Sequence, residues 1–161
     1  KAALIIKEVL DSMKLTSFVK TSGNKGLQIY IPLPDDRYTY EDTRLFTSFI
    51  AEYLVAKDPD SFTVERMKKK RNNRLYVDYV QHAEGKTIIA PYSPRGNPNA
   101  TAAAPLFWEE LKDGLTMETF QIPIMMERIK KQGDPFAAFF EVKKEQNFEP
   151  VLQFLKTQST N

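Results

Sequence analysis

The sequence predicts an α+β fold, a mostly antiparallel sheet with helices packed against it. Short segments of alternating polar and apolar residues follow one another through tight turns, first over 17–33 and again over 74–92. Longer segments, at the start of the chain and after residue 40, carry apolar residues three and four positions apart, which is the period of an amphipathic helix. Strands and helices do not alternate regularly, which argues against a parallel βαβ series.

The first third of the chain is expected to contain two helices and a hairpin. A helix covers about 2–13, and a strand, SFVKT, follows at 17–21. The turn SGNKG leads into the strand LQIYIPL at 27–33, which prolines end because proline cannot donate to a sheet ladder. A long helix with a broad apolar face then covers about 40–56.

The remainder is expected to add two strands and several helices. A short helix begins near Thr63 and leads into a basic run, and the strands RLYVDYV at 74–80 and KTIIAPY at 86–92 follow. A helix begins at Pro105, since proline at the first helical position loses no hydrogen bond. The last third consists of helices and loops, and no shift in composition marks a second domain.

Composition restricts the kinds of metal site and partner. The 161 residues include no cysteine and one histidine, so a bound metal would be held by carboxylate oxygens, which favours magnesium, manganese or calcium. No apolar run approaches the roughly 18 residues of a membrane span, so no membrane partner is expected. The absence of cysteine excludes disulfides and fits the cytoplasm, which is the expected location. The net charge of +2 is too small to identify a nucleic-acid-binding protein.

The segment RMKKKRNNR at 66–74 contains six basic residues and no acidic one. It is either a solvated surface or a patch that binds the phosphate backbone of DNA. The candidate DNA-binding residues are Lys68, Lys69, Lys70, Arg71 and Arg74.

Three further positions could carry chemistry. Asp78, in the middle of an apolar strand, needs either a salt bridge or a metal ion to offset its desolvation, although one carboxylate cannot hold a pair of metal ions. The turn SGNKG, with the Ser22 hydroxyl and Lys25, is either an ordinary hairpin turn or an anion-binding nest. Arg95, in a loop stiffened by prolines, is either plain surface or a preorganised phosphate ligand. The lone His82 is expected at the surface or at a strand end.

Taken in order, TSGNKGLQIYIPL, RLYVDYVQ, TIIAPYSPRG and ATAAAPLFWEEL closely resemble the polymerase domain of bacterial ATP-dependent DNA ligase D, a member of the archaeo-eukaryotic primase superfamily. The resemblance implies a primase-like, RRM-related catalytic core that is truncated at its N-terminus. Residues 1–112 would be the core match and residues 113–161 the helical C-terminal end of the domain.

The resemblance also implies residue roles. Asp78 matches a catalytic, metal-binding aspartate, and an Asp-x-Asp pair before Lys1 would complete a site for two Mg²⁺ or Mn²⁺ ions. The expected nucleotide-phosphate ligands are Ser22, Gly23, Lys25, Gly26, Gln28 and Arg95. One departure affects this set: the family usually has histidine where this chain has Gln28. Glutamine cannot carry a charge, so we expect Gln28→His to strengthen nucleotide binding.

The function implied by the resemblance is nucleotide addition at DNA ends during non-homologous end joining of double-strand breaks. The expected partners are DNA ends, nucleoside triphosphates and a ligase domain in the same parent chain, with Ku as a further candidate, in the cytoplasm at the nucleoid. The 161-residue piece alone is expected to be inactive. The alternative is a non-catalytic module that binds DNA ends or docks a partner. A nucleotide site requires strands 27–33 and 74–80 in one antiparallel sheet, with Asp78 on its open face beside the Ser22 turn and Arg95.

Overall fold

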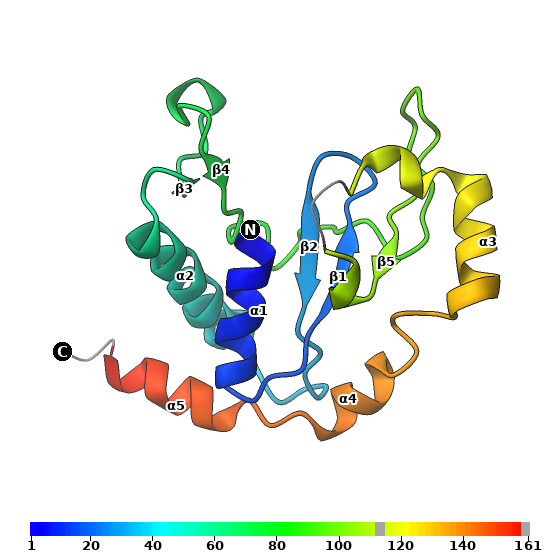
Figure 1. Cartoon of the computed structure of the whole chain (residues 1–161). Coiled ribbons are helices and arrows are strands. Elements are labelled where there is room, and N and C mark those ends of the chain that lie inside the picture. The colour runs from blue at the N-terminus through cyan, green and yellow to red at the C-terminus, as the bar shows by residue number, and fades with distance from the viewer. Residues whose placement is uncertain (112–114, 159–161) are drawn as a thin grey trace. The chain divides into compact units, whose positions relative to one another are not determined.

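The computed structural model describes residues 1–111 and 115–158, and the chain divides into two compact units (Figure 1). The helical unit consists of Lys1–Met13, Pro34–Thr87 and Asn147–Asn161, and the sheet unit consists of Lys14–Leu33 and Ile88–Gln146. No helix among the described residues is both long enough and apolar enough to cross a membrane.

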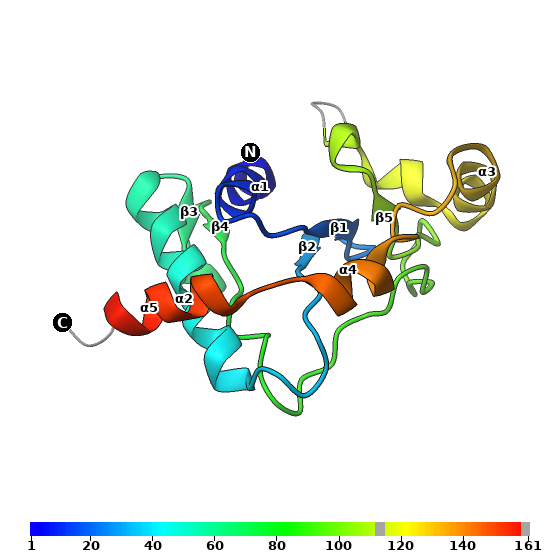
Figure 2. The same cartoon turned by 90° about the horizontal axis from the view of Figure 1, so that it is seen from below.

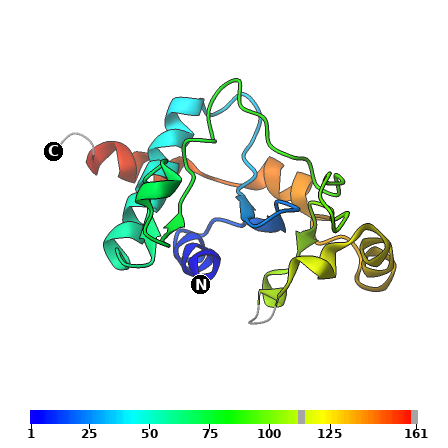
Figure 3. The same cartoon turned by 90° about the horizontal axis from the view of Figure 1, so that it is seen from above.

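Three helices form most of the helical unit: α1 (Ala2–Ser12), α2 (Tyr40–Lys57) and α5 (Glu149–Gln158). The α1 and α2 helices confirm the predictions from apolar spacing. Figures 2 and 3 show α5 and α1 each lying beside α2. Their apolar faces form the core of this unit, in which Phe148 makes edge-to-face contacts with the rings of Tyr38 and Phe46, at centroid distances of 5.3 and 5.5 Å.

A capping box begins α2. The Thr39 hydroxyl accepts a hydrogen bond from the Asp42 backbone N–H at 3.2 Å, and the Asp42 carboxylate accepts one from the Thr39 backbone N–H at 3.1 Å. These bonds satisfy donors that a helix N-terminus leaves unpaired. The other carboxylate oxygen of Asp42 pairs with Lys156 of α5 at 2.9 Å, so the same residue also joins two helices.

The segment from Thr63 to residue 80 differs from the prediction. Phe62–Thr63 is a strand, β3, and only Lys68–Lys70 form a short 3₁₀ helix, η1. Asn72 and Asn73 then adopt left-handed backbone angles, with φ of 49° and 61°, which end any helix. The predicted strand at 74–80 is reduced to β4 (Leu75–Tyr76), which pairs in parallel with β3.

The sheet unit contains an antiparallel sheet in the order β2-β1-β5. The hairpin of β1 (Phe18–Thr21) and β2 (Leu27–Tyr30) confirms the predicted strand pair, with Lys20 directly opposite Gln28. The third strand, β5 (Pro105–Leu106), lies on the other side of β1. The same unit holds η2 (Trp108–Glu110), η3 (Met117–Phe120), α3 (Ile122–Gln132) and α4 (Phe139–Glu145).

Two predictions for the sheet unit are wrong. No strand forms at 86–92, although Tyr92 donates its backbone N–H to the Ala103 carbonyl at 2.7 Å. Pro105 does not begin a helix but belongs to β5, an edge strand, where its lack of an N–H costs no ladder hydrogen bond. Only the short η2 follows it.

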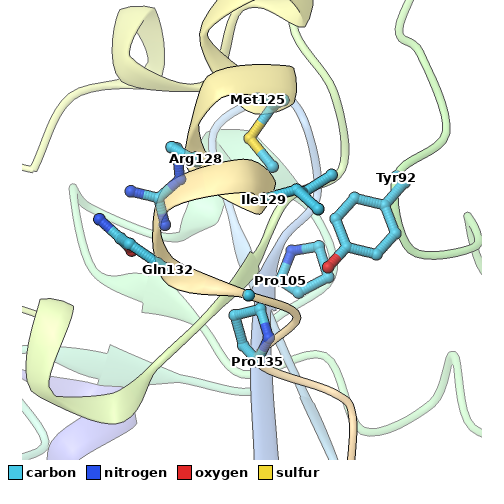
Figure 4. A pocket seen from close by; sticks show the side chains of 8 residues that line it. Tyr92, Pro105, Met125, Arg128, Ile129, Gln132 and Pro135 are labelled. Carbon is cyan, nitrogen blue, oxygen red and sulfur yellow. The ribbon is translucent and has the colours of Figure 1, made fainter.

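Buried side chains hold the sheet unit together. One sheet face carries an apolar core whose buried members are Val19, Ala102, Ala104, Leu106, Phe120 and Met125. The buried Gln146 amide bridges two segments: its oxygen accepts from the Thr16 N–H at 2.7 Å, and its nitrogen donates to the carbonyls of Thr16 and Pro32. A small, mostly apolar pocket lies between α3 and Pro105 (Figure 4), and no predicted site residue lines it.

Candidate functional site

The turn between β1 and β2 is organised by one hydroxyl group. Ser22 Oγ accepts hydrogen bonds from the backbone N–H groups of Asn24 and Gly26, both at 3.2 Å. The Ser22 backbone N–H donates to the Gly26 carbonyl at 2.8 Å, which closes the loop. Lys25 stands exposed at the tip of this turn, and its side chain makes no bond within the described residues.

Gly23 joins this turn to the loop that carries Arg95. Its φ is +70°, and a Cβ atom built there would overlap Arg95 Cγ, so the arginine side chain lies directly against the glycine. The Gly23 carbonyl accepts two hydrogen bonds, from Thr101 Oγ1 at 2.6 Å and from Asn97 Nδ2 at 3.0 Å. The close approach requires glycine, because any side chain would fill the space that Arg95 occupies.

The Arg95 loop is itself fixed by backbone pairing. Arg95 donates its N–H to the Thr101 carbonyl at 2.8 Å, and Ala103 donates to the Ser93 carbonyl at 2.9 Å. Within the described ranges the half-buried Arg95 guanidinium has no carboxylate or hydrogen-bond partner. The structure therefore brings Ser22, Gly23 and the Arg95 side chain together. The Arg95 guanidinium is a positive charge without a partner in the described residues.

Lys20 is a residue of this region that the sequence reasoning missed. It is fully buried on the central strand, and its ammonium group donates to Gln28 Oε1 at 2.5 Å and to the Thr21 carbonyl at 3.3 Å. Burial, and then the nearby Arg95 charge, lower the pKa of Lys20 to about 8. A signal was present in the sequence, because a lysine in the apolar strand SFVKT is as unusual as the aspartate in RLYVDYV.

Asp78 lies elsewhere than predicted. It follows β4 in the helical unit, so it does not share a sheet with β2, and that part of the prediction is wrong. Its exposed carboxylate needs no salt bridge, because Oδ1 accepts from the Tyr76 hydroxyl and the Gln81 N–H, both at 3.2 Å. The second of these bonds forms a turn that ends the extended segment. The expected proximity of Asp78 to the Ser22 turn stays a prediction.

The lone histidine also differs from expectation. His82 is half-buried in the helical unit, where its Nε2 lies 2.6 Å from the Thr43 hydroxyl and its ring contacts that of Tyr40 at 5.4 Å. Burial lowers the pKa of His82, which favours a neutral imidazole that braces the start of α2.

The basic run separates into two groups. The Arg71 guanidinium donates to the carbonyls of Glu65 and Arg66 and lies 4.1 Å from the centre of the Tyr76 ring, and Arg74 donates to the Arg71 carbonyl. These two arginines therefore support the local turn. By contrast, the side chains of Lys68, Lys69 and Lys70 are exposed and make no bond in the part of the chain that is described.

No group of three or more histidine, cysteine, aspartate or glutamate residues that could hold a metal ion occurs among the described residues. Asp78 could supply one carboxylate oxygen, Oδ2, which takes no hydrogen bond from residues 1–111 or 115–158. Such a hard oxygen ligand suits Mg²⁺ or Mn²⁺.

Comparison with known proteins identifies the family of this chain. The family model described as LigD, primase-polymerase domain, matches residues 1–136. The bifunctional non-homologous end joining protein LigD of Bacillus subtilis is 50% identical over 159 residues, which cover 99% of this chain and 26% of that protein. The multifunctional non-homologous end joining DNA repair protein LigD of Mycobacterium tuberculosis is 33% identical over 83% of this chain and 17% of its own length.

A solved structure gives the same result. The polymerase domain from Mycobacterium tuberculosis ligase D, in complex with DNA, matches with a TM-score of 0.76 and 33% identity, over 84% of this chain and 46% of that chain. The chain thus spans about a quarter or less of the length of these curated relatives. The family model covers both the Ser22 turn and the Asp78 segment. The chain belongs to the LigD primase-polymerase domain family.

Proposed function

We propose that this chain is part of a polymerase that adds nucleotides to DNA ends during non-homologous end joining, and that the sheet unit holds the nucleoside triphosphate. The observation that carries the proposal is the contact between Arg95 and Gly23. It holds the Arg95 side chain, whose guanidinium has no acidic partner in the described residues, against a turn whose backbone is organised by Ser22.

The residues of the turn and of the Arg95 loop would each make a different contact with a polyphosphate. Arg95 offers a planar fork of donors that matches phosphate oxygens, and it stays charged at every physiological pH. Lys25, at the exposed tip, adds a mobile charge. The Gly23 and Gly26 positions let phosphate approach the backbone, and Gln28 supplies an amide N–H₂ group.

Asp78 is proposed as one oxygen ligand of a two-metal site with Mg²⁺ or Mn²⁺. The ions would align the attacking 3′ hydroxyl with the α-phosphate and neutralise charge on both oxygens of the displacement. The chain's own contribution is to hold the Asp78 carboxylate by two hydrogen bonds to Oδ1, which leaves Oδ2 without a hydrogen bond from the described residues and available to a cation. Further carboxylates would have to complete the site.

Lys68, Lys69 and Lys70 are proposed to contact DNA phosphates, because their ammonium groups are exposed and take part in no local bonds among the described residues. This observation also favours a second candidate, a module that binds DNA ends without catalysis. The two candidates differ in nucleotide binding, which only the polymerase requires. A ligase module in the parent protein, and Ku at the break, are proposed as partners on the strength of the family.

The first test measures binding of MgATP to the 161-residue chain by isothermal titration calorimetry. Arg95→Met should weaken binding about tenfold or more, because a hydrogen bond to a charged group contributes roughly 1.5–3 kcal/mol. Lys130→Met, which removes an exposed charge from α3 of the same unit, is the matched control and should leave the affinity unchanged. The absence of binding by the wild-type chain, or equal loss in both variants, would reject the proposed nucleotide site.

The second test measures nucleotide addition to a DNA primer by the protein as expressed from its own gene, with Mn²⁺ present. Asp78→Ala should abolish addition while DNA binding is kept, since the substitution removes a metal ligand and no DNA contact. Retained addition would show that Asp78 is not a metal ligand. DNA binding without MgATP binding in the wild-type protein would favour the non-catalytic module.

A further inference from the structure

Lys20 is a buried cation with no counter-charge among the described residues. Its side chain is completely buried, and its only hydrogen-bond partners in the described residues are the neutral oxygens of Gln28 and Thr21. The Tyr30 ring lies 5.8 Å from its ammonium nitrogen. A buried charge is costly unless it is paired, so this arrangement suits a site in which an anion arrives from outside the chain.

The contact with Lys20 also fixes the direction of the Gln28 amide. An ammonium group can only donate, so the amide oxygen must face Lys20 and the amide N–H₂ must face away from it. That N–H₂ group has no hydrogen-bond partner among residues 1–111 and 115–158, and the Gln28 side chain is only half-buried. On the side away from Lys20, the Gln28 amide therefore presents two donors and no acceptor.

We propose that Lys20 is a positioning residue for nucleotide binding: it holds the Gln28 amide with its donors toward the triphosphate and adds a buried positive charge beneath the phosphates. The inference rests on the proposed function of the sheet unit. Glutamine at position 28 cannot carry a charge. In the proposed site, Gln28 supplies the hydrogen-bond donors at this position and Lys20 supplies the positive charge.

The electrostatics of the region agree with this role. The pKa of Lys20 is lowered to about 8 by burial and then by Arg95, so half of the molecules would lose this charge near pH 8 in the absence of ligand. The groups facing Lys20 are Gln28 and Tyr30 from β2, Arg95 from its loop and the uncharged Pro105 from β5. Burial raises the pKa of Tyr30, so the phenol stays neutral in this range. A bound polyphosphate would stabilise the ammonium form and raise the Lys20 pKa.

The inference is tested by following the titration of Lys20 by NMR in the lysine-labelled chain, with and without saturating MgATP, using Lys20→Met to assign the signal. We expect the Lys20 pKa to rise by about one unit or more when MgATP binds, which requires the affinity to fall about tenfold from pH 7 to pH 9.5. Lys20→Arg, whose charge does not titrate, should bind at pH 7 and lose this fall with pH.

The outcomes separate the two proposals. A wild-type chain that binds MgATP through Arg95 but leaves the Lys20 titration unchanged overturns the positioning role and keeps the proposed nucleotide site. No MgATP binding at any pH rejects the nucleotide site itself, and the role of Lys20 with it. Should Lys20→Met or Lys20→Arg fail to fold, the titration of the wild-type lysine, assigned by through-bond correlation to its own backbone signals, still decides the question.

Discussion

Gly23→Ala is the substitution for which the structure gives the sharpest prediction. Gly23 is buried between the hairpin and the Arg95 loop, with φ at +70°. An alanine there would adopt a left-handed conformation, which costs about 1–2 kcal/mol for a residue with a side chain. Its Cβ atom would overlap Arg95 Cγ and lie 3.0 Å from the Ala103 nitrogen and 3.1 Å from the Ala102 carbonyl carbon.

The two kinds of neighbour respond differently. The Arg95 side chain can rotate away, which relieves that overlap but removes the guanidinium from the turn. The backbone of Ala103 cannot move freely, because its N–H is bonded to the Ser93 carbonyl at 2.9 Å. Overpacking of this kind typically costs about 1–3 kcal/mol. Together with the conformational term, we expect Gly23→Ala to lower the free energy of unfolding by roughly 2–5 kcal/mol.

Gly26→Ala is a matched control in the same turn. The nearest atom to a Cβ at Gly26 is Ser22 Oγ at 3.7 Å, an ordinary contact, and its φ is not in the left-handed region. Its effect on stability should stay within about 0.5 kcal/mol. Urea unfolding followed by circular dichroism measures both variants, and MgATP titration below the transition should show weaker binding by Gly23→Ala than by the wild-type chain. Equal stability of the two variants would refute the close packing of Arg95 on Gly23.

Three further predictions use other parts of the molecule. Gln146→Ala should lower the unfolding free energy by about 2–3 kcal/mol in urea denaturation, because it leaves buried backbone groups unpaired; a loss below 0.5 kcal/mol would contradict this. Hydrogen bonds from the Thr39 backbone and Lys156 lower the pKa of Asp42, so its stabilisation is complete above the unfolded-state pKa and is lost as pH falls through the folded value. Asp42→Asn should therefore make the loss of thermal stability on acidification smaller than in the wild-type chain, as measured by thermal unfolding at a series of pH values. Gln28→His should not strengthen MgATP binding at pH 6, contrary to the expectation from sequence, because the Lys20 ammonium disfavours a protonated imidazole. In a Lys20→Met background it should strengthen binding about fivefold, and a gain in the wild-type background would argue against the Lys20 contact.

Local patterns in the sequence determined several elements correctly. The spacing of apolar residues decided α1 and α2, and alternation on either side of a glycine-containing turn decided the β1–β2 hairpin. These features depend on residues within a few positions of one another, so the local pattern contains the necessary information. The order of several short motifs identified the family, which no single motif could have done.

Only the tertiary structure decided the placement of Arg95 and Lys20. Arg95 lies against Gly23 because distant segments pair through backbone hydrogen bonds, and no periodicity records such a pairing. Lys20 is buried because neighbours on both sides of β1 cover it, although lysine by itself favours the surface. For the same reason the strand predicted around Asp78 failed: with Gln81 available to close a turn and β3 as the partner, only Leu75–Tyr76 gained a ladder. Long-range contacts outweigh local preference wherever an extended segment has more than one possible partner.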